Sequence, residues 1–361
     1  MNCLILDANF DQVAIIDEYK SFIWTDRYCE AGDFELYLPV ETNALPYLQI
    51  GNYVEIADSD RYMIIDTVEV TTDVDAGDML LVSGKSLEYI LDRRIVWHPT
   101  ELQTNLEDAV KEMIEANIIN PTDPSRKIPN FTFKDSGDDV IKGTNVNTAY
   151  FGKSLYEATQ GLCGYADCGF KVLPVKYQSE IGFEFQLYRG VNRSYSQEEI
   201  PWVAFSNNFD NLLSSRFYST DTKYKTVCLA IWDGEELLTQ EATRKEGAGE
   251  GLNRREMATE VVDLGVEMEW NENGLTDEQR EKYKKIIYDK GRDSLYPHKV
   301  TDEFEGELDT TKQYVYERDF FVGDIVEVRN QYGMSASARL VELVRTCDDD
   351  GYRTITTFEV V

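Results

Sequence analysis

Residues 320–361 read FFVGDIVEVRNQYGMSASARLVELVRTCDDDGYRTITTFEVV, and this stretch decides the predicted fold because it forms one complete β-module. Apolar and polar residues alternate after Gly323, and the turn sequence 330–333 separates two predicted strands. The acidic turn 348–351 then predicts a hairpin onto the run 354–358. We therefore expect a short strand, a turn, a longer strand and a hairpin at this end of the chain.

A similar stretch begins at Gly51 and repeats the same order of strands and turns. Both copies start with Gly-x-x-Val-Glu, from Gly51 and from Gly323. The glycine of the last turn follows after 26 residues in the early copy (51 to 77) and after 28 in the late copy (323 to 351). This pattern predicts an internal duplication of a small barrel-like β-domain, and the alternative is two unrelated β-meanders.

Composition limits the function of the chain. Its 361 residues are enough for two to four domains, and 36 basic against 67 acidic residues give a net charge of −31. Such a chain repels nucleic acid and anionic membranes, which argues against a DNA-binding enzyme but suits a conduit along which DNA slides. General solubility is the simpler explanation of the charge. No run of 18 apolar residues and no signal peptide occurs, so we expect no membrane insertion.

The expected fold class is α+β and β-rich, with two barrel-like β-modules and two α/β inserts. Alternating residues predict strands in the first ninety-odd positions, whereas capping patterns predict helices further along. The second module is expected to be discontinuous, because a helical insert interrupts it. The expected divisions are a first β-module at 1–97, a peripheral α+β domain at 98–206, the second β-module at 207–240 with 301–361, and a helical and loop insert at 241–300.

Four helix starts carry capping signals. Thr104 with Glu107, Ser154 with Glu157 and Thr276 with Gln279 fit capping boxes. Ser86 is expected to cap a short helix that ends at Arg93-Arg94, where cations suit a helix C-terminus.

Two Gly-Lys-Ser tripeptides, at 84–86 and 152–154, open predicted helices as a phosphate-binding loop does. Both lack the first glycine of that motif, since the position holds Met79 in one and Asn147 in the other, so we interpret them as helix caps. The loop 247–251 lacks the spacing of a dinucleotide fingerprint and is interpreted as flexible. No cofactor is predicted.

Metal and thiol sites are not predicted either. Asp73, Asp75 and Asp78, and likewise Asp348 to Asp350, could hold calcium, but the twelfth position counted from Asp73 is Gly84 and not the glutamate of an EF-hand. Acidic hairpin tips explain both groups more simply. The six cysteines are scattered and are expected to be free thiols, mostly buried, from a reducing cytoplasm; Cys163 and Cys168 form the one close pair, too isolated for a zinc site.

Histidine scarcity argues against common hydrolases. The chain has two histidines, His98 and His298, and neither lies in a His-Glu-x-x-His motif or beside a Gly-x-Ser-x-Gly elbow. No carboxylate pair stands out among 67 acidic residues as a glycosidase pair. We therefore predict no catalytic residue and no enzyme activity.

Several stretches resemble the tail-hub family of long-tailed phages, the N-terminal part of tail-associated lysins. The resemblance spans nearly the whole chain and concerns structural positions. It is strongest at 20–97 and 318–358 and is carried by Trp24, Arg27-Tyr28, Gly32 to Pro39, Gly51, Met63 to Ile65, Val82 to Leu87, Leu91 to Val96, Phe321 to Val328 and Ala338-Arg339.

This resemblance implies a phage or prophage virion protein: a homotrimeric baseplate or tail-tip hub, similar to contractile-tail hubs. It implies a ring of two modules per chain that continues the sixfold tail tube, lets DNA pass without specific binding, and contacts tail-tube proteins, a distal tail protein and possibly a fibre or spike. It also implies assembly in the bacterial cytoplasm. Many relatives continue into a hydrolase or receptor-binding region, and this chain stops at Val361, so lytic activity is not carried over. The alternatives are a cell-wall hydrolase and a carbohydrate-binding adhesin.

Overall fold

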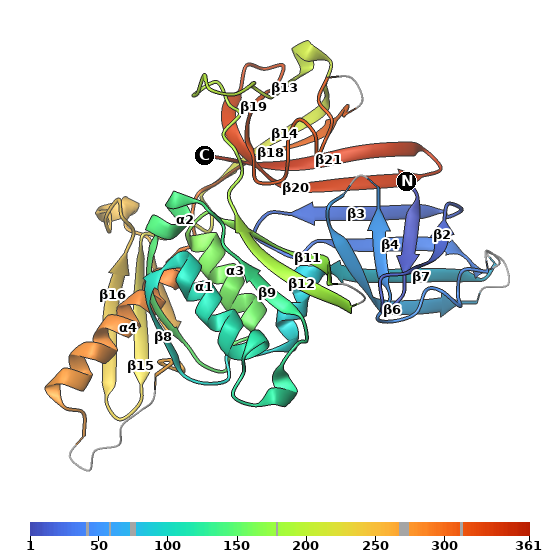
Figure 1. Ribbon diagram of the computed structural model, residues 1–361. Helices are drawn as coiled ribbons and strands as arrows, with labels where there is room; N and C mark the ends of the chain where they lie inside the picture. The colour runs from blue at the N-terminus through green and yellow to red at the C-terminus, as the bar shows by residue number, and fades with distance from the viewer. Residues whose placement is uncertain (41–42, 58, 73–76, 178–179, 267–273, 311–312) are drawn as a thin grey trace.

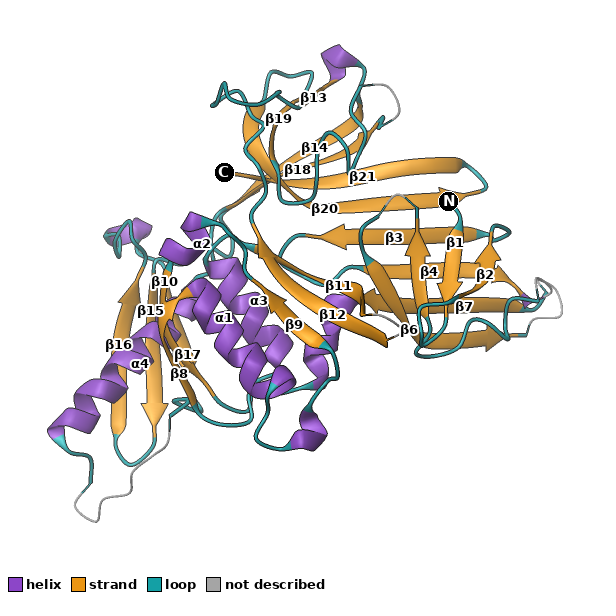
Figure 2. Ribbon diagram, viewed as in Figure 1, coloured by secondary structure: helices purple, strands orange, loops and turns teal. Residues whose placement is uncertain are grey.

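The computed structural model comprises residues 1–361 and describes all of them except 41–42, 58, 73–76, 178–179, 267–273 and 311–312. One large twisted sheet carries both ends of the sequence, and two smaller α/β parts lie together beyond one end of its strands (Figure 1). Helices are confined almost entirely to those smaller parts (Figure 2). The predicted β-rich α+β fold is confirmed.

Seven strands form the N-terminal part of the large sheet. They alternate between buried and exposed residues; in β4, Phe34, Leu36 and Leu38 are buried while Glu35 and Tyr37 face outward. The 3₁₀ helix η2 (Leu87–Arg93) follows directly. The strands are β1 (Cys3–Leu6), β2 (Gln12–Ile16), β3 (Ser21–Arg27), β4 (Asp33–Pro39), β5 (Tyr53–Ile56), β6 (Tyr62–Thr71) and β7 (Met79–Ser86).

Six more strands complete the sheet from the C-terminal part of the chain. Their core holds Phe205, Phe304, Phe320 and Phe358, all of them buried. The longest pair is the hairpin predicted from the acidic turn at 348–351. The strands are β13 (Ala204–Ser206), β14 (Leu212–Thr220), β18 (Thr301–Leu308), β19 (Ile325–Arg329), β20 (Ser335–Asp348) and β21 (Gly351–Val360).

The predicted repeat is visible in the pairing of the strands. The path β5-β6-β7-β4-β3 in the first part has the same order as β19-β20-β21-β18-β14 in the second. Each copy also carries a register shift at the same place, after Ile65 in β6 and after Leu340 in β20. The two N-terminal glycines, Gly51 and Gly323, both have positive φ, at 93° and 102°.

The two copies are not separate closed barrels, and this corrects the barrel-like modules expected from the sequence. Strand β20 pairs with β3, so that both copies belong to one thirteen-stranded sheet. Among the described residues the main path of that sheet stays open, running from β14 to β2. The reason is that β20 is long enough to pair with β19 near its start and with β3 near its end.

The first smaller part packs its helices and short strands around one apolar cluster. Its helix α1 (Leu106–Ile114) buries Val110, Met113 and Ile114 and continues into the π-helix η3 (Glu115–Ile119). The other elements are β8 (Thr100–Asn105), η4 (Pro124–Arg126), β9 (Phe131–Lys134), α2 (Asp139–Gly143), β10 (Asn145–Tyr150), α3 (Leu155–Tyr165), β11 (Gly169–Tyr177) and β12 (Glu180–Tyr188).

The second smaller part is a three-stranded sheet covered by one helix. Helix α4 (Asp277–Leu295) packs on the sheet formed by β15 (Val227–Asp233), β16 (Leu237–Thr243) and β17 (Glu256–Glu260). Gly291 allows the close approach, since an added Cβ would lie 3.0 Å from the Cβ of Ala230. Within the range 207–240, η5 (Asn207–Phe209) precedes β14 of the large sheet, whereas β15 and the start of β16 belong to this small one. The turn η6 (Gly251–Asn253) precedes β17.

The helix starts follow the sequence signals in part. The capping box of Thr276 with Gln279 is confirmed, and Ser154 accepts the Glu157 N–H at 3.4 Å. The Thr104 box is wrong, because Thr104 pairs in β8 and Asn105 caps α1 instead. None of the described helices is long and apolar enough to cross a membrane.

Candidate functional site

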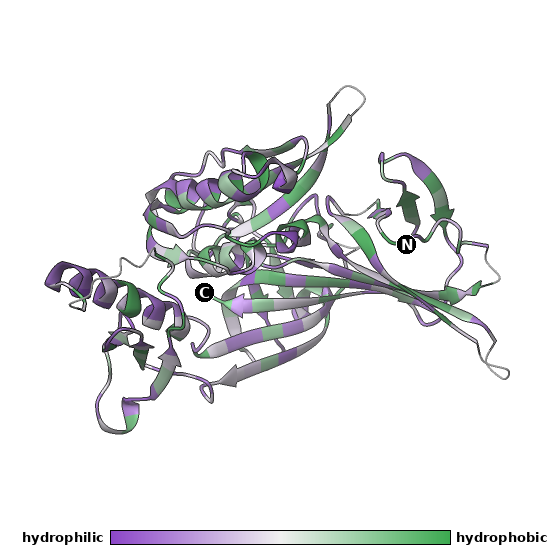
Figure 3. Ribbon diagram, turned by 90° about the horizontal axis from the view of Figure 1, so that it is seen from below, coloured by the Kyte–Doolittle hydropathy of each residue, from purple (hydrophilic) through white to green (hydrophobic). Residues whose placement is uncertain are grey.

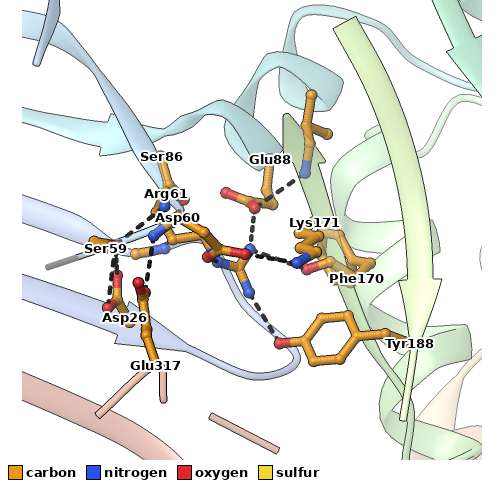
Figure 4. A network of polar contacts seen from close by, with 12 residues as sticks. Asp26, Ser59, Asp60, Arg61, Ser86, Glu88, Phe170, Lys171, Tyr188 and Glu317 are labelled. Carbon is orange, nitrogen blue, oxygen red and sulfur yellow. Dashed lines mark hydrogen bonds and ion pairs between the residues drawn. The ribbon is translucent and has the colours of Figure 1, made fainter. Parts of the chain in front are cut away.

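Several buried charged side chains gather at a junction where the two copies of the repeat and the first smaller part meet (Figure 4). At its centre, Asp26 on β3 forms a buried ion pair with Arg345 on β20. Asp26 also accepts hydrogen bonds from Trp24 Nε1 at 3.0 Å, Ser59 Oγ at 3.2 Å and Tyr316 OH at 3.3 Å. The carboxylate is thus bonded to three segments of the chain besides its own strand.

Arg61, just before β6, extends this junction to the smaller part. Its guanidinium forms an ion pair with the buried carboxylate of Glu88 on η2 and donates to Tyr188 OH at 2.9 Å. Lys171 on β11 reaches Asp60 at 2.6 Å. Although burial opposes the shift, Arg61 and Lys171 hold the pKa of Asp60 below its usual range. These contacts fasten β11 and β12 to the large sheet.

Glu317 is the group of this junction that titrates near neutral pH. Its Oε1 accepts the Asp60 N–H at 2.8 Å, joining the loop before β6 to the loop before β19. Burial, together with the carboxylates of Asp60 and Asp26, raises the pKa of Glu317 to about 7. The junction therefore attaches the smaller part to the large sheet, and it can bind a proton at Glu317.

The second functional feature is the face of the large sheet that points away from its two apolar cores. Figure 3 shows hydrophilic and hydrophobic residues alternating along the long strands. From β14 to β6 this face carries nine acidic and five basic residues among those described. The acidic ones are Asp33, Glu35, Glu69, Glu303, Glu305, Glu307, Glu342, Asp348 and Glu359, and the basic ones are Arg27, Lys85, Arg216, Arg339 and Arg353.

The carboxylates of this face also affect one another. Burial raises the pKa of Glu303 most, and the nearby carboxylates of Glu359 and Glu305 raise this pKa further. Carboxylates that crowd in this way repel one another and any polyanion that approaches. The face can therefore border a path for DNA without binding it.

A cavity of about 1050 Å³ lies between α3, the end of α4, the middle of β20 and the end of β21. Two of its cations are bonded within the chain: Lys290 Nζ donates to the Ala149 carbonyl at 2.6 Å, and Lys299 pairs with Glu359. Lys153 is exposed and lies over the Tyr150 ring. The exposed rim includes the carboxylates of Glu157 and Glu260. The cavity offers no concentrated charge that would select a ligand.

The two Gly-Lys-Ser tripeptides are held apart and do not form a phosphate site. Ser154 caps α3, as expected. Ser86 precedes η2 but does not cap it, because its hydroxyl accepts the Gly32 N–H at 2.8 Å. Gly84 is required by packing, since an added Cβ would lie 1.8 Å from the Ile64 carbonyl oxygen.

The other candidate sites are separate in space. Asp348, at the tip of the β20–β21 hairpin, pairs with Arg353 at 2.7 Å and accepts the Asp350 N–H at 2.9 Å. Asp73 and Asp75 lie outside the described residues, and in the described part of the chain no group of three His, Cys, Asp or Glu could hold a metal. The six cysteines are free thiols, four buried and two half-buried, which confirms the prediction.

Sequence reasoning missed the junction. Asp26 and Arg345 occupy positions on the core faces of their strands, between apolar neighbours such as Trp24 and Leu343. A charge at a core position of an alternating strand was the available signal, because such a charge is buried only when it is paired. The identity of its partner, 319 residues away, was not readable from the pattern.

Comparison with known proteins gives one family and several structures of the same fold. Residues 2–358 match the family model described as "Siphovirus ReqiPepy6 Gp37-like protein". The tail protein from Neisseria meningitidis MC58 is similar at 12% identity and a TM-score of 0.55, over 99% of this chain and 96% of that one. The prophage MuSo2 43 kDa tail protein from Shewanella oneidensis is similar at 12% identity and a TM-score of 0.50, over 99% and 98%. No curated protein matches the sequence.

Proposed function

The chain belongs to the siphovirus Gp37-like family, and from this premise we propose that it is a structural phage or prophage tail protein that forms a homotrimeric hub at the baseplate or tail tip. In this role it joins the sixfold tail tube to threefold distal parts. The fold it shares with two tail proteins supports the assignment. The hub is a virion component, assembled in the bacterial cytoplasm.

The acidic face of the large sheet is the observation that carries the proposal. A tail conduit must pass DNA without holding it, and a surface with nine acidic and five basic residues repels the phosphate backbone. We propose that this face lines the DNA exit channel.

The repeated strand order supports the threefold-to-sixfold geometry. Two copies of the repeat per chain and three chains give six similar units, which match a sixfold ring. The proposed divisions follow those expected from the sequence: the modules at 1–97 and at 207–240 with 301–361 form the ring, and the parts at 98–206 and 241–300 lie outside it. The exceptions are β13, which belongs to the large sheet, and β15 with the start of β16, which belong to the second smaller part. The position of both smaller parts beyond one end of the strands supports this division (Figure 1).

The proposed partners are tail-tube proteins, a distal tail protein and a fibre or spike, and the hub itself is not an enzyme. Binding to tail-tube rings tests the role directly. Purified chain, mixed with rings of the cognate tail-tube protein, should cap the rings in electron micrographs. Failure to cap the rings, combined with lysis of host cell walls in a zymogram by residues 1–361 alone, would overturn the structural assignment.

A further inference from the structure

One seam between the two copies of the repeat is already formed inside the chain. The distal half of β20 pairs antiparallel with β3, from Glu342 opposite Arg27 to Asp348 opposite Ser21. Two ion pairs cross this seam: Arg27 Nε reaches Glu342 at 2.7 Å, and Arg345 pairs with the buried Asp26.

Each of these two strands has a counterpart in the opposite copy of the repeat, and both counterparts have free edges. Strand β6 corresponds to β20, and β5 covers only its residues Tyr62–Ile64, so Thr67–Thr71 pair with β7 alone among the described residues. Strand β14 corresponds to β3 and, within the described part of the chain, pairs with β18 alone. Thr67, Glu69 and Thr71 are exposed, as is Val70 at 47%. Free backbone edges of this length are templates for pairing with a strand of another chain.

The bulge that both copies share fixes which residue of one copy corresponds to which residue of the other. Thr67 follows the bulge of β6 as Glu342 follows that of β20, so these two residues correspond. Tracing the ladders outward gives the remaining equivalences: Ser83 with Thr357, Glu35 with Glu305, and Ile23 with Arg216.

From these equivalences we infer that β6 of one chain pairs antiparallel with β14 of a second copy, as a counterpart of the seam within the chain that lacks its two ion pairs. The inference rests on the proposed homotrimer. The register places Thr67 opposite Thr220, Glu69 opposite Tyr218 and Thr71 opposite Arg216. The ion pair of Arg345 with Asp26 is replaced in this seam by Val70 and Ser219. The ion pair of Glu342 with Arg27 is replaced by Thr67 and Thr220.

The difference in chemistry makes the two kinds of seam unequal. The seam within the chain is permanent and contains a buried ion pair that tolerates no partial opening. The seam between copies relies on backbone hydrogen bonds and lacks the two ion pairs of the seam within the chain. Its charged residues Glu69 and Arg216 are opposite Tyr218 and Thr71, so salt removes little attraction from it. Salt does screen the repulsion between chains that carry −31 each. A ring of this kind assembles and opens at its three intermolecular seams.

Disulfide trapping tests the register in the full chain. The variant carrying Glu69→Cys and Tyr218→Cys places two thiols on directly opposite positions, about 5 Å apart at Cβ, which is close to disulfide geometry. The matched control combines Glu69→Cys with Ser214→Cys, four positions along β14 and therefore about 13 Å away. The two single variants report any background from the native thiols. Light scattering in high salt establishes the oligomeric state before oxidation.

The expected result is a covalent trimer on a non-reducing gel for the matched pair, at least tenfold more abundant than for the displaced pair. A trimer by light scattering that gives equal or no cross-linking for the two pairs would overturn the register while leaving the hub proposal intact. A chain that stays monomeric in high salt and also fails to cap tail-tube rings would overturn the homotrimer itself, and with it the seam.

Discussion

Asp26 and Arg345 form a buried ion pair across the β3–β20 ladder and join positions 319 residues apart in the sequence. Their side chains are 1% and 2% exposed, so neither charge is solvated by water. The pair therefore links the N-terminal and C-terminal copies of the repeat, and its loss would leave a charge without compensation in the protein interior.

Replacing Arg345 by methionine should destabilise the chain strongly. The change leaves the Asp26 carboxylate buried without its cation, and we expect a loss of about 3–5 kcal/mol in the free energy of unfolding. Arg353→Met is the matched control, because the Arg353–Asp348 pair is at the surface and its loss should cost less than about 1 kcal/mol. Urea unfolding measures both, and equal losses in the two variants would show that the buried pair is unimportant.

Stability should fall as the pH rises through neutrality because of Glu317. Its folded-state pKa of about 7 lies above its usual value of 4.5, so the folded chain binds the proton more tightly. The resulting stabilisation is fully present below about pH 4.5 and is lost as the pH passes 7. We expect the Tm to decrease between pH 5 and pH 8 by about 2 °C more in the wild type than in Glu317→Gln. Glu35→Gln, which removes an exposed carboxyl group, should follow the wild type; identical pH profiles for Glu317→Gln and wild type would contradict the prediction.

Gly84→Ala should disturb the β6–β7 ladder. An added Cβ would lie 1.8 Å from the Ile64 carbonyl oxygen and 2.9 Å from the Phe34 ring, so the strands must separate. We expect a loss of about 3 kcal/mol or more. Gly143→Ala is the control, because nothing lies within 4 Å of its added Cβ, and it should change stability by less than about 0.5 kcal/mol. Thermal unfolding of both variants measures the two losses. An unchanged Tm for Gly84→Ala would show that β6 and β7 can separate to accommodate the added Cβ without loss of stability.

Limited proteolysis should cut first in the loop before η6. Lys245 is exposed there, and Gly247, Gly249 and Gly251 all have positive φ, while the loop is tied back through Thr226 Oγ1, which donates to the Ala248 carbonyl at 2.6 Å. Trypsin should cleave after Lys245, and Lys245→Gln should delay the first cut. Mass spectrometry of the fragments identifies the site. Early cleavage within 51–82 would instead mean that the first β-module is the less stable part.

Trimer formation should increase with salt. Three chains carry about −93 at neutral pH, and screening this repulsion favours association. We expect light scattering to report monomers at about 20 mM salt and a growing trimer fraction towards 0.5 M. A trimer that dissociates as salt is raised would point to ion pairs, such as one between Glu69 and Arg216, as the attraction at the seam, and would contradict its reliance on backbone hydrogen bonds.

Local patterns in the sequence determined much of the fold. Alternation along 33–39 and 325–329, the turn at 348–351 and the capping box at Thr276 each depend on neighbours a few residues away, so one sequence was sufficient to predict the strands, the hairpin and the helix start. The repeat was readable for the same reason, since Gly51 and Gly323 need the same backbone conformation.

Tertiary structure decided how the copies are joined. The β20–β3 ladder, the Asp26–Arg345 pair and the Arg61–Glu88 pair bring together residues that share no local pattern, and the choice of partner depends on the burial of whole strands. For this reason the two expected barrels became one open sheet, and for the same reason the free edges of β6 and β14 could be recognised only from the pairing. Local sequence selects each strand and its faces, but long-range packing selects the neighbour of each edge.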